Sequence, residues 1–317
     1  MIYSRTKHIK DSIVSGIHKI YSGNAKKKCR RMEFILGMTL ALYIFTRCQA
    51  TETPSQFDFI KNGVVAHAGG EADFPENTLP AFRNAITLGV EWVELDIHLS
   101  KDRRLVVIHD KDTERVGDKK LIVCESDFDH LKEVDVAATF RKQHKSNLDQ
   151  CPKAEIPLLE DVLQLVMSQG KSRLLIDPKP DCVPQIMELI MRMKATPYVG
   201  FLGYSVQRMK EVKKMDSSIP IFFCRKLVSS DTELQEDIDI AMAQGFEGIN
   251  LHTPVEEPAE QVIKRVVRIH AAGLKAMVWT VNDAEKLKAL AKGSVDYIIT
   301  DVPKLFLNVK QGMSEAK

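Results

Sequence analysis

The sequence lacks several features that would assign it at once to a class of protein. Its formal net charge is only +2 over 317 residues, so it lacks the excess of positive charge that is typical of proteins that bind nucleic acid. It contains six cysteines but no CxxC spacing, which argues against a zinc site. It has no internal repeat and no Asn-x-Ser/Thr sequon, and the missing sequon weakens an assignment to the secretory pathway.

Long apolar runs are also missing, and the run Phe34–Phe45 is too short to cross a bilayer comfortably, because a spanning helix needs about 20 residues. A basic run, 26–31, precedes it, and small and polar residues follow from Cys48. This order is typical of a secretory signal peptide, which predicts a leader over residues 1–60 and a secreted or lumenal protein. Two alternatives stay open: a membrane anchor formed by residues 34–46, and a mobile N-terminal arm.

Four cysteines lie outside the leader, namely Cys124, Cys151, Cys182 and Cys224. A secreted protein can form disulfides, and Cys124 and Cys151 flank a polar segment, which favours that pair. Buried free thiols are the equal alternative, because free cysteine is often buried.

From Gly63 onward, short β-branched runs alternate with amphipathic segments of helical length. The strands are expected at Val64–His67, Trp92–Leu99, Leu105–Ile108, Leu174–Asp177, Val199–Tyr204, Ile219–Phe223, Gly248–Leu251, Leu274–Thr280 and Tyr297–Thr300. The helices are expected at Leu79–Leu88, Leu159–Ser168, Val183–Met193, Val206–Lys214, Glu233–Gln244, Glu260–Ala272 and Ala284–Ala291. This alternation predicts an α/β fold with a parallel sheet, either open or closed.

The second and third predicted strands must form a hairpin, because the four residues 101–104 between them are too few for a crossover helix. A tight turn centred on Asp102 and Arg103 would pair Ser100 with Leu105 and would place Asp96 opposite His109. Glu94 and Asp96 share a face of the strand, since side chains alternate along it. A slip of one residue in the register would break this arrangement.

Carboxylates at the ends of predicted strands indicate a metal site. Glu94 and Asp96 are close like charges that need a positive partner, and Asp177 ends another strand. Ligands that are all oxygen favour one divalent cation, Mg²⁺ or Ca²⁺. Lys179 follows Asp177 by two residues and is predicted to reach a phosphate oxygen. The alternatives are a solvated strand edge for Glu94 and Asp96, and a surface ion pair for Asp177 and Lys179.

Two histidines end predicted strands, His67 before a pair of glycines and His109 at the end of the hairpin. Imidazole titrates near neutral pH, so one histidine is expected to remove a proton from the attacking oxygen and the other to protonate the leaving oxygen. A structural role is the alternative for each. His98, which lies farther out on the hairpin, and His252, which has no such context, are interpreted as structural.

The ordered motifs resemble the glycerophosphodiester phosphodiesterase family over about residues 63–303. They are His67-Ala68-Gly69-Gly70, Pro75-Glu76-Asn77-Thr78, Glu94-Leu95-Asp96, Val106-Val107-Ile108-His109-Asp110, Ile156-Pro157-Leu158-Leu159-Glu160, Asp177-Pro178-Lys179, Trp279-Thr280-Val281-Asn282 and Thr300-Asp301-Val302-Pro303. The resemblance implies a TIM-type (β/α)8 barrel over residues 61–312, with a β-hairpin projecting after the second strand and a tail over 313–317. It implies metal binding by Glu94, Asp96 and Asp177, and acid–base roles for His67 and His109.

Two residues depart from the family pattern. Ala68 stands where the family usually has an arginine that would hold the phosphate, and Asp177 stands where it usually has glutamate. Sphingomyelinase-D-like enzymes also lack that arginine, and they have a lysine matching Lys179 and a tryptophan matching Trp279. Trp279 is therefore expected either to contact substrate at the end of its strand or to pack inside the barrel.

The expected function is metal-dependent hydrolysis of a phosphodiester, with a glycerophosphodiester cleaved to glycerol phosphate and an alcohol. Three alternatives remain at this point. One is a lysophospholipase D or sphingomyelinase D-like enzyme that acts on a lysolipid. The second is a catalytically inactive barrel that binds lipid or phosphate, and the third is a purely structural protein. The residues favour an enzyme, because function follows the site and not the fold.

Overall fold

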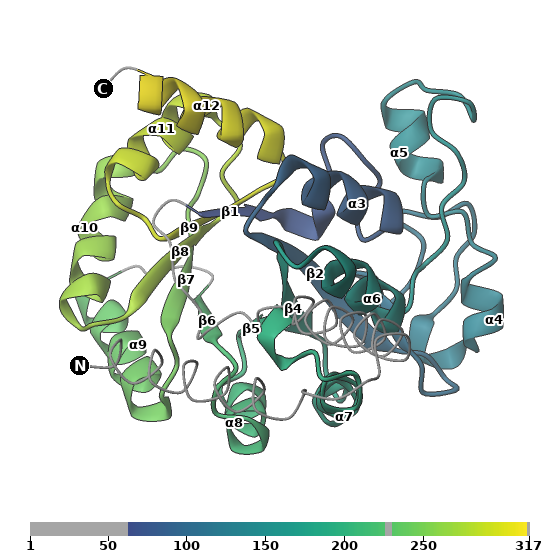
Figure 1. Cartoon of the computed structure of the whole chain (residues 1–317), viewed down its shortest axis with the longest axis horizontal. Helices are drawn as coiled ribbons and strands as arrows, with labels where there is room; N and C mark the ends of the chain where they lie inside the picture. Colours follow the sequence, from purple (N-terminus) through teal and green to yellow (C-terminus); the bar gives the residue numbers. More distant parts are fainter. Residues whose placement is uncertain (1–62, 226–229, 316–317) are drawn as a thin grey trace, which may run out of the picture. The chain divides into compact units, whose positions relative to one another are not determined.

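The computed structural model describes residues 63–225 and 230–315. Eight parallel strands form a closed barrel around which the chain winds (Figure 1), namely β1 (Gly63–Ala66), β2 (Trp92–Leu99), β4 (Arg173–Pro178), β5 (Val199–Gly203), β6 (Ile221–Arg225), β7 (Gly248–His252), β8 (Lys275–Trp279) and β9 (Tyr297–Thr300). The pairing of β1 with both β2 and β9 closes the barrel. The predicted (β/α)8 barrel is thus confirmed.

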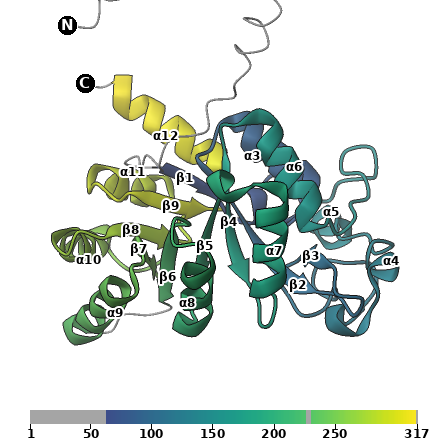
Figure 2. The same cartoon turned by 60° about the horizontal axis from the view of Figure 1, so that its bottom comes forward.

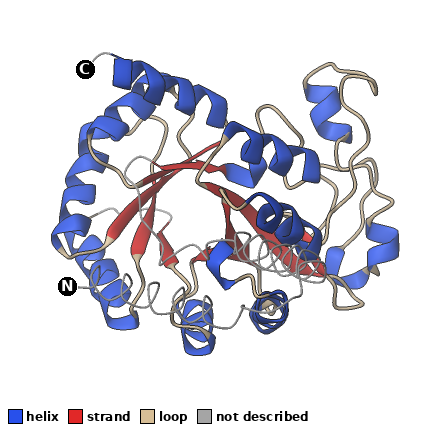
Figure 3. Cartoon of the chain, viewed as in Figure 1, coloured by secondary structure: helices blue, strands red, loops and turns tan. Residues whose placement is uncertain are grey.

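One helix follows each barrel strand, or each strand with its insertion, and the helices form the outer layer (Figure 3). They are α3 (Leu79–Leu88), α6 (Leu159–Gln169), α7 (Val183–Met193), α8 (Val206–Met215), α9 (Asp231–Gln244), α10 (Ala259–Ala271), α11 (Ala284–Lys292) and α12 (Pro303–Glu315). Local chemistry sets several of their ends. The hydroxyl oxygen of Thr78 caps α3, and Gly89 ends it in the left-handed conformation.

Two separate apolar clusters fill the two faces of the sheet, as a closed barrel requires. The larger cluster lies between strands and helices and contains Val93, Leu95 and Ile97 of β2. The second contains Trp92, Leu175, Met277 and other residues of the opposite parity, which point into the barrel. Glu94 and Asp96 continue the inward parity of Trp92, and they therefore point into the barrel toward the C-terminal ends of the strands.

The predicted hairpin forms from β2 and β3 (Leu105–Val107), but its predicted register was wrong by one residue. Leu99, and not Ser100, lies opposite Leu105, and the amide of Ile108, not His109, donates to the carbonyl of Asp96. The loop is one residue longer than a two-residue turn because Arg103 adopts a left-handed conformation, with φ of 64°. The hydroxyl of Ser100 also accepts a hydrogen bond from the amide of Arg104 at 2.9 Å, which closes this longer loop.

An insertion, residues 108–158, lies between β3 and α6 beside the hairpin (Figure 2). It contains the 3-10 helix η2 (Val123–Glu125) and the short helices α4 (Phe128–Leu131) and α5 (Ala138–Gln143). Its apolar side chains form a small core of their own around Val116, Val123, Leu131 and Ile156. The other 3-10 helices are η1 (His67–Gly69) and η3 (Thr196–Tyr198).

Several expectations concern the ends of the chain and its cysteines. The leader over 1–60 lies outside the described residues, so the signal peptide and the anchor stay predictions. In the described part of the chain, no helix has the length and apolar character that a membrane span needs. Helix α12 continues to Glu315, so residues 313–315 of the expected tail belong to it. Cys124 and Cys151 are free thiols, and the favoured disulfide between them was wrong.

Candidate active site

The C-terminal ends of the barrel strands meet at one rim, called the barrel mouth below. His67 follows β1 there, Asp96 lies near the end of β2, and Asp177 lies near the end of β4. Asp96 and Asp177 are direct neighbours in the register between their parallel strands. Five predicted residues gather at this rim: His67, Glu94, Asp96, Asp177 and Lys179. Substrate sites of (β/α)8 barrels lie at the same end.

The three carboxylates are enclosed to different degrees. Glu94 is 4% exposed and Asp96 is 2% exposed, whereas the Asp177 side chain is 15% exposed. The Nζ of Lys179 donates to Asp96 Oδ1 at 2.5 Å and to Asp177 Oδ2 at 2.7 Å. The amide of Ala68 donates to Glu94 at 2.8 Å. These donors hold the carboxylates in place and leave further carboxylate oxygens for another partner.

The charges at the mouth perturb one another strongly. Burial, and after it the charge of Asp96, raises the pKa of Glu94 to about 8. Burial also raises the pKa of Asp177, although Lys179 opposes the shift. For Asp96, burial is outweighed by Lys179, and the pKa is lowered. One lysine for three enclosed carboxylates leaves an excess of negative charge, and a hard cation with oxygen ligands suits these residues.

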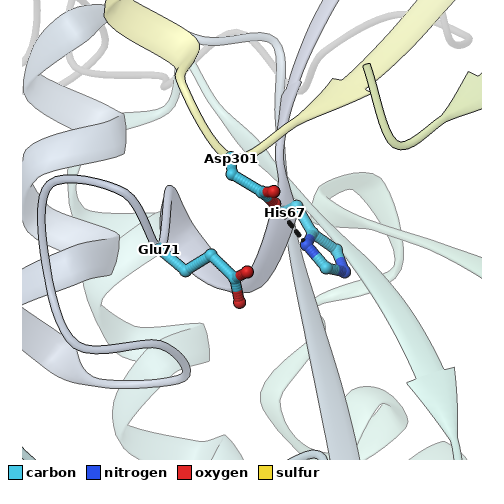
Figure 4. Close-up of side chains that lie close together, drawn as sticks. All are labelled: His67, Glu71 and Asp301. Carbon is cyan, nitrogen blue, oxygen red and sulfur yellow. Dashed lines mark hydrogen bonds and ion pairs between the residues drawn. The ribbon is translucent and has the colours of Figure 1, made fainter. Parts of the chain in front are cut away.

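His67 is held by a carboxylate that follows β9. Its Nδ1 lies 2.6 Å from Asp301 Oδ1 (Figure 4), which leaves Nε2 for a substrate proton. Burial lowers the pKa of His67, but the hydrogen bond to Asp301 and the charge of Glu94 outweigh burial and raise the pKa to about 10. The imidazole is therefore held in its protonated form at neutral pH.

A second acidic side chain approaches the same imidazole. Among residues 63–225 and 230–315, His67, Glu71 and Asp301 form the one group of three whose ligand atoms all lie within 4.8 Å of one another. Figure 4 shows Glu71 on the loop after β1, with its carboxylate directed toward the other two. The carboxylates of Glu94, Asp96 and Asp177 also lie at the mouth, but their oxygens do not all lie this close to one another.

His109 lies just beyond β3 and remains half exposed, with 51% of its side chain accessible. The altered hairpin register moves it from the position opposite Asp96, yet its charge still contributes to lowering the pKa of Asp96. The Nδ1 of His109 lies 2.7 Å from Asp110 Oδ1. His98, interpreted as structural, contacts the carbonyl oxygen of His109 through Nε2 at 3.1 Å, so its role is to hold the backbone of that residue.

Trp279 lies at the mouth at the end of β8, where it contacts His252, which was interpreted as structural, and Tyr204, which was not singled out. Its ring centroid lies 4.9 Å from that of His252 and 6.2 Å from that of Tyr204. His252 ends β7 with the inward parity of Asn250, and Tyr204 is 39% exposed beyond β5. The feature of the sequence that could have indicated a role for His252 and Tyr204 is their place at the C-terminal end of a strand.

Asn77 and Asp301 were also undervalued from the sequence. Asn77 was named only as part of a motif, but its Nδ2 donates to Asp96 Oδ2 at 3.0 Å. Asp301 was likewise named only as part of a motif, but its Oδ1 lies 2.6 Å from Nδ1 of His67. The Asn77–Asp96 and His67–Asp301 contacts each join two separate motifs, so the motifs alone gave no indication of them.

Known proteins resemble this chain in sequence. A glycerophosphodiester phosphodiesterase of Caldanaerobacter subterraneus is 26% identical over 257 residues, which cover 79% of this chain and 98% of that protein. A lysophospholipase D of Rattus norvegicus is 26% identical over 241 residues, which cover 71% of each chain.

Solved structures share the fold. A glycerophosphodiester phosphodiesterase of Thermotoga maritima aligns with a TM-score of 0.62 and 22% identity, covering 78% of this chain and 98% of that one. An Oleispira antarctica phosphodiesterase in complex with the product sn-glycerol-3-phosphate aligns with a TM-score of 0.66 and 21% identity, covering 79% and 97%. The sequence pattern of one family matches residues 67–305, and the chain therefore belongs to the glycerophosphoryl diester phosphodiesterase family.

Proposed function

We propose that this protein hydrolyses glycerophosphodiesters to glycerol phosphate and an alcohol, with a divalent cation, Mg²⁺ or Ca²⁺, held by Glu94, Asp96 and Asp177. The observation that carries the proposal is the meeting of His67, Lys179 and these three carboxylates at one barrel mouth. Membership of the family and the phosphodiesterase names of the relatives support the reaction type.

We assign the cation to the three carboxylates and not to the group around His67. All their donors are oxygen, which Mg²⁺ and Ca²⁺ prefer, whereas Nδ1 of His67 is already engaged by Asp301. When bound, such a cation supplies positive charge to the non-bridging oxygens of the phosphate. Lys179 lies beside the same carboxylates, and we assign it to a phosphate oxygen in place of the arginine that Ala68 replaces.

The two histidines move the protons. His67 is protonated at neutral pH, so its Nε2–H donates to the oxygen of the departing alcohol. His109, which is more exposed, accepts the proton of the attacking oxygen. That oxygen belongs either to water or to a neighbouring hydroxyl of the substrate, and in the latter case a cyclic phosphate forms first.

A lysolipid is the second candidate substrate, with lysophospholipase D regiochemistry. The half-exposed Tyr204 beside Trp279 gives the mouth an aromatic edge that suits an amphiphile, and one relative is a lysophospholipase D. Product analysis on glycerophosphocholine and on lysophosphatidylcholine separates the two substrates.

The decisive experiment measures cleavage of both compounds with EDTA, with Mg²⁺ and with Ca²⁺. His67→Ala and His109→Ala are each expected to lower kcat on the order of 100-fold or more, because acid–base groups contribute that much. His130→Ala, on the exposed surface of the insertion, is the control and should retain activity. Full activity in EDTA would refute the metal dependence, and activity that survives both histidine substitutions would refute their roles.

With p-nitrophenyl phosphodiesters, His67→Ala is expected to recover much of the lost rate, because p-nitrophenolate leaves without protonation. His109→Ala should not recover. The opposite pattern would exchange the two roles.

A further inference from the structure

A chain of charged side chains leads from His109 through the insertion to the loop after β1. The Oδ1 of Asp110 lies 2.7 Å from Nδ1 of His109. The Oδ2 of Asp110 accepts a hydrogen bond from Nε of Arg115 at 2.6 Å. Burial raises the pKa of Asp110, but the hydrogen bonds from His109 and Arg115 outweigh burial and lower it. Asp110 is therefore an acceptor, so the proton of the imidazole lies on Nδ1 and Nε2 of His109 faces away from the carboxylate.

The far side of the same guanidinium binds the barrel. Both terminal nitrogens of Arg115 donate to the two carboxylate oxygens of Glu76, in a bidentate pair. The next residue, Asn77, donates to Asp96. The guanidinium of Arg115 thus connects the loop after β1, which supports Asp96, with Asp110, which orients His109.

The insertion determines where Arg115 lies. Its neighbour Val116 is 8% exposed in the core of the insertion, and the carbonyl of Val116 accepts a hydrogen bond from the amide of Thr139 at 3.2 Å. A cavity of about 230 Å³ separates the insertion from the loop after β1, and Glu76, Arg115 and Phe140 are among the residues that line it. Across this gap Arg115 bridges the two segments, so its contacts depend on both.

We propose that Arg115 is a positioning residue for the reaction: by holding Asp110 and Glu76 at once, it fixes the ring of His109 with Nε2 toward the barrel mouth. The insertion is then part of the catalytic apparatus, since its core sets the position of the guanidinium. This inference rests on the proposed function of His109, although the orientation of the imidazole can be measured without catalysis.

The test compares Arg115→Met with Arg141→Met. Arg141 is a matched control, because it also belongs to the insertion, but it pairs with Asp135 and donates to the carbonyl of Cys151 instead of binding Asp110. Arg115→Met is expected to lower kcat on the order of 10- to 100-fold with little change in KM, since a displacement of about 1 Å can cost on the order of 100-fold. Arg141→Met should lower the melting temperature and retain kcat below it.

Arg115→Lys provides a second variant that keeps the charge. Lysine cannot form the bidentate pair with Glu76 and also bind Asp110, so kcat should fall between those of wild type and Arg115→Met. Nitrogen-15 NMR of the histidine side chains gives a readout independent of turnover. It should show His109 protonated at Nδ1 in the wild type, and a mixture of tautomers in Arg115→Met, with the signal assigned by its loss in His109→Gln.

Three results would overturn the inference. The first is an unchanged His109 signal and unchanged kcat in Arg115→Met. The second is equal loss of kcat in Arg115→Met and Arg141→Met, which would make Arg115 merely structural. The third, if Arg115→Met does not fold, is wild-type kcat in Arg115→Lys. A wild type that shows the Nδ1 tautomer but cleaves no phosphodiester would instead refute the proposed function.

Discussion

Burial determines how single residues at the barrel mouth respond to protons and cations. Glu94 and Asp96 are neighbours on one face of β2, and Lys179 pairs with Asp96 and with Asp177 of β4. An enclosed carboxylate in that setting either keeps a proton or binds a metal ion. Such a residue is therefore expected to bind a cation at high pH and to be a neutral acid at low pH.

Glu94 gives a prediction about pH and cation binding. Its pKa is raised from 4.5 to about 8 in the folded chain, by burial first and by Asp96 second. Between these values the folded state holds a proton that the unfolded state releases, so without a cation stability falls as pH rises through this window. Because a cation must displace this proton, added Mg²⁺ or Ca²⁺ should raise the melting temperature more at about pH 8 than at about pH 6.

Differential scanning fluorimetry with EDTA and with each cation measures this effect. The Glu94→Gln variant has no titratable group at position 94. The rise in its melting temperature on adding a cation should therefore depend less on pH. An equal rise in melting temperature at both pH values in the wild type would contradict the assignment of Glu94 as a ligand.

Asp301 gives a second prediction at this scale. Asp301→Asn removes the negative charge beside Nδ1 of His67, so the pKa of the imidazole should fall and its orientation should loosen. We expect kcat to fall on the order of 100-fold, as misplaced catalytic groups cost about that much. The control is Asp296→Asn, since Asp296 pairs with His270 at the same 2.6 Å at the N-terminal end of β9, away from the mouth. Equal kinetics in both variants would refute the role of Asp301.

At the scale of elements, local rules account for most of the barrel. The predicted bounds of α3, α7, β2 and β9 agree with the structure, because each is framed by capping residues, glycine or proline, or by a clear apolar pattern. The hairpin loop was mispredicted, because its register depends on a left-handed Arg103 that no turn motif in the sequence requires. Short helices of the insertion have too few residues for a periodic pattern to show.

Helix α12 gives a prediction about an element. Gly312 lies in its last turns, and a Cβ placed there would meet no heavy atom within 4 Å. Gly312→Ala should raise the free energy of unfolding by about 0.5 kcal/mol, since alanine restricts the unfolded chain and favours the helix. Urea denaturation measures the change, and a loss of stability would mean that α12 does not persist to this point.

At the scale of the whole molecule, the barrel interior is filled by large rings that require small neighbours. A Cβ on Gly63 would lie 2.3 Å from the ring of Tyr297. That ring packs edge-on against the rings of Trp92 and Phe222, with distances between ring centroids of 6.3 Å and 5.8 Å. It therefore has little room to move. Closure of the barrel between β1 and β9 thus depends on a residue without a side chain.

Gly63→Ala should therefore lower the free energy of unfolding by about 1–3 kcal/mol, the usual cost of overpacking a core. Urea denaturation is again the measurement, and Gly312→Ala is the matched control, because the same exchange there meets open space. A neutral effect at position 63 would show that the ring of Tyr297 relaxes freely.

The sequence by itself determined the alternation of strands and helices, the carboxylates at strand ends and the two histidines, because these follow from local periodicity and from residue chemistry. Only the tertiary structure decided which of these groups meet. Asp301 reaches His67 because β9 lies beside β1, and Arg115 reaches Glu76 because the insertion folds back on the loop after β1. Such contacts join residues far apart in the chain, and closure of the barrel, which no local pattern encodes, brings them together.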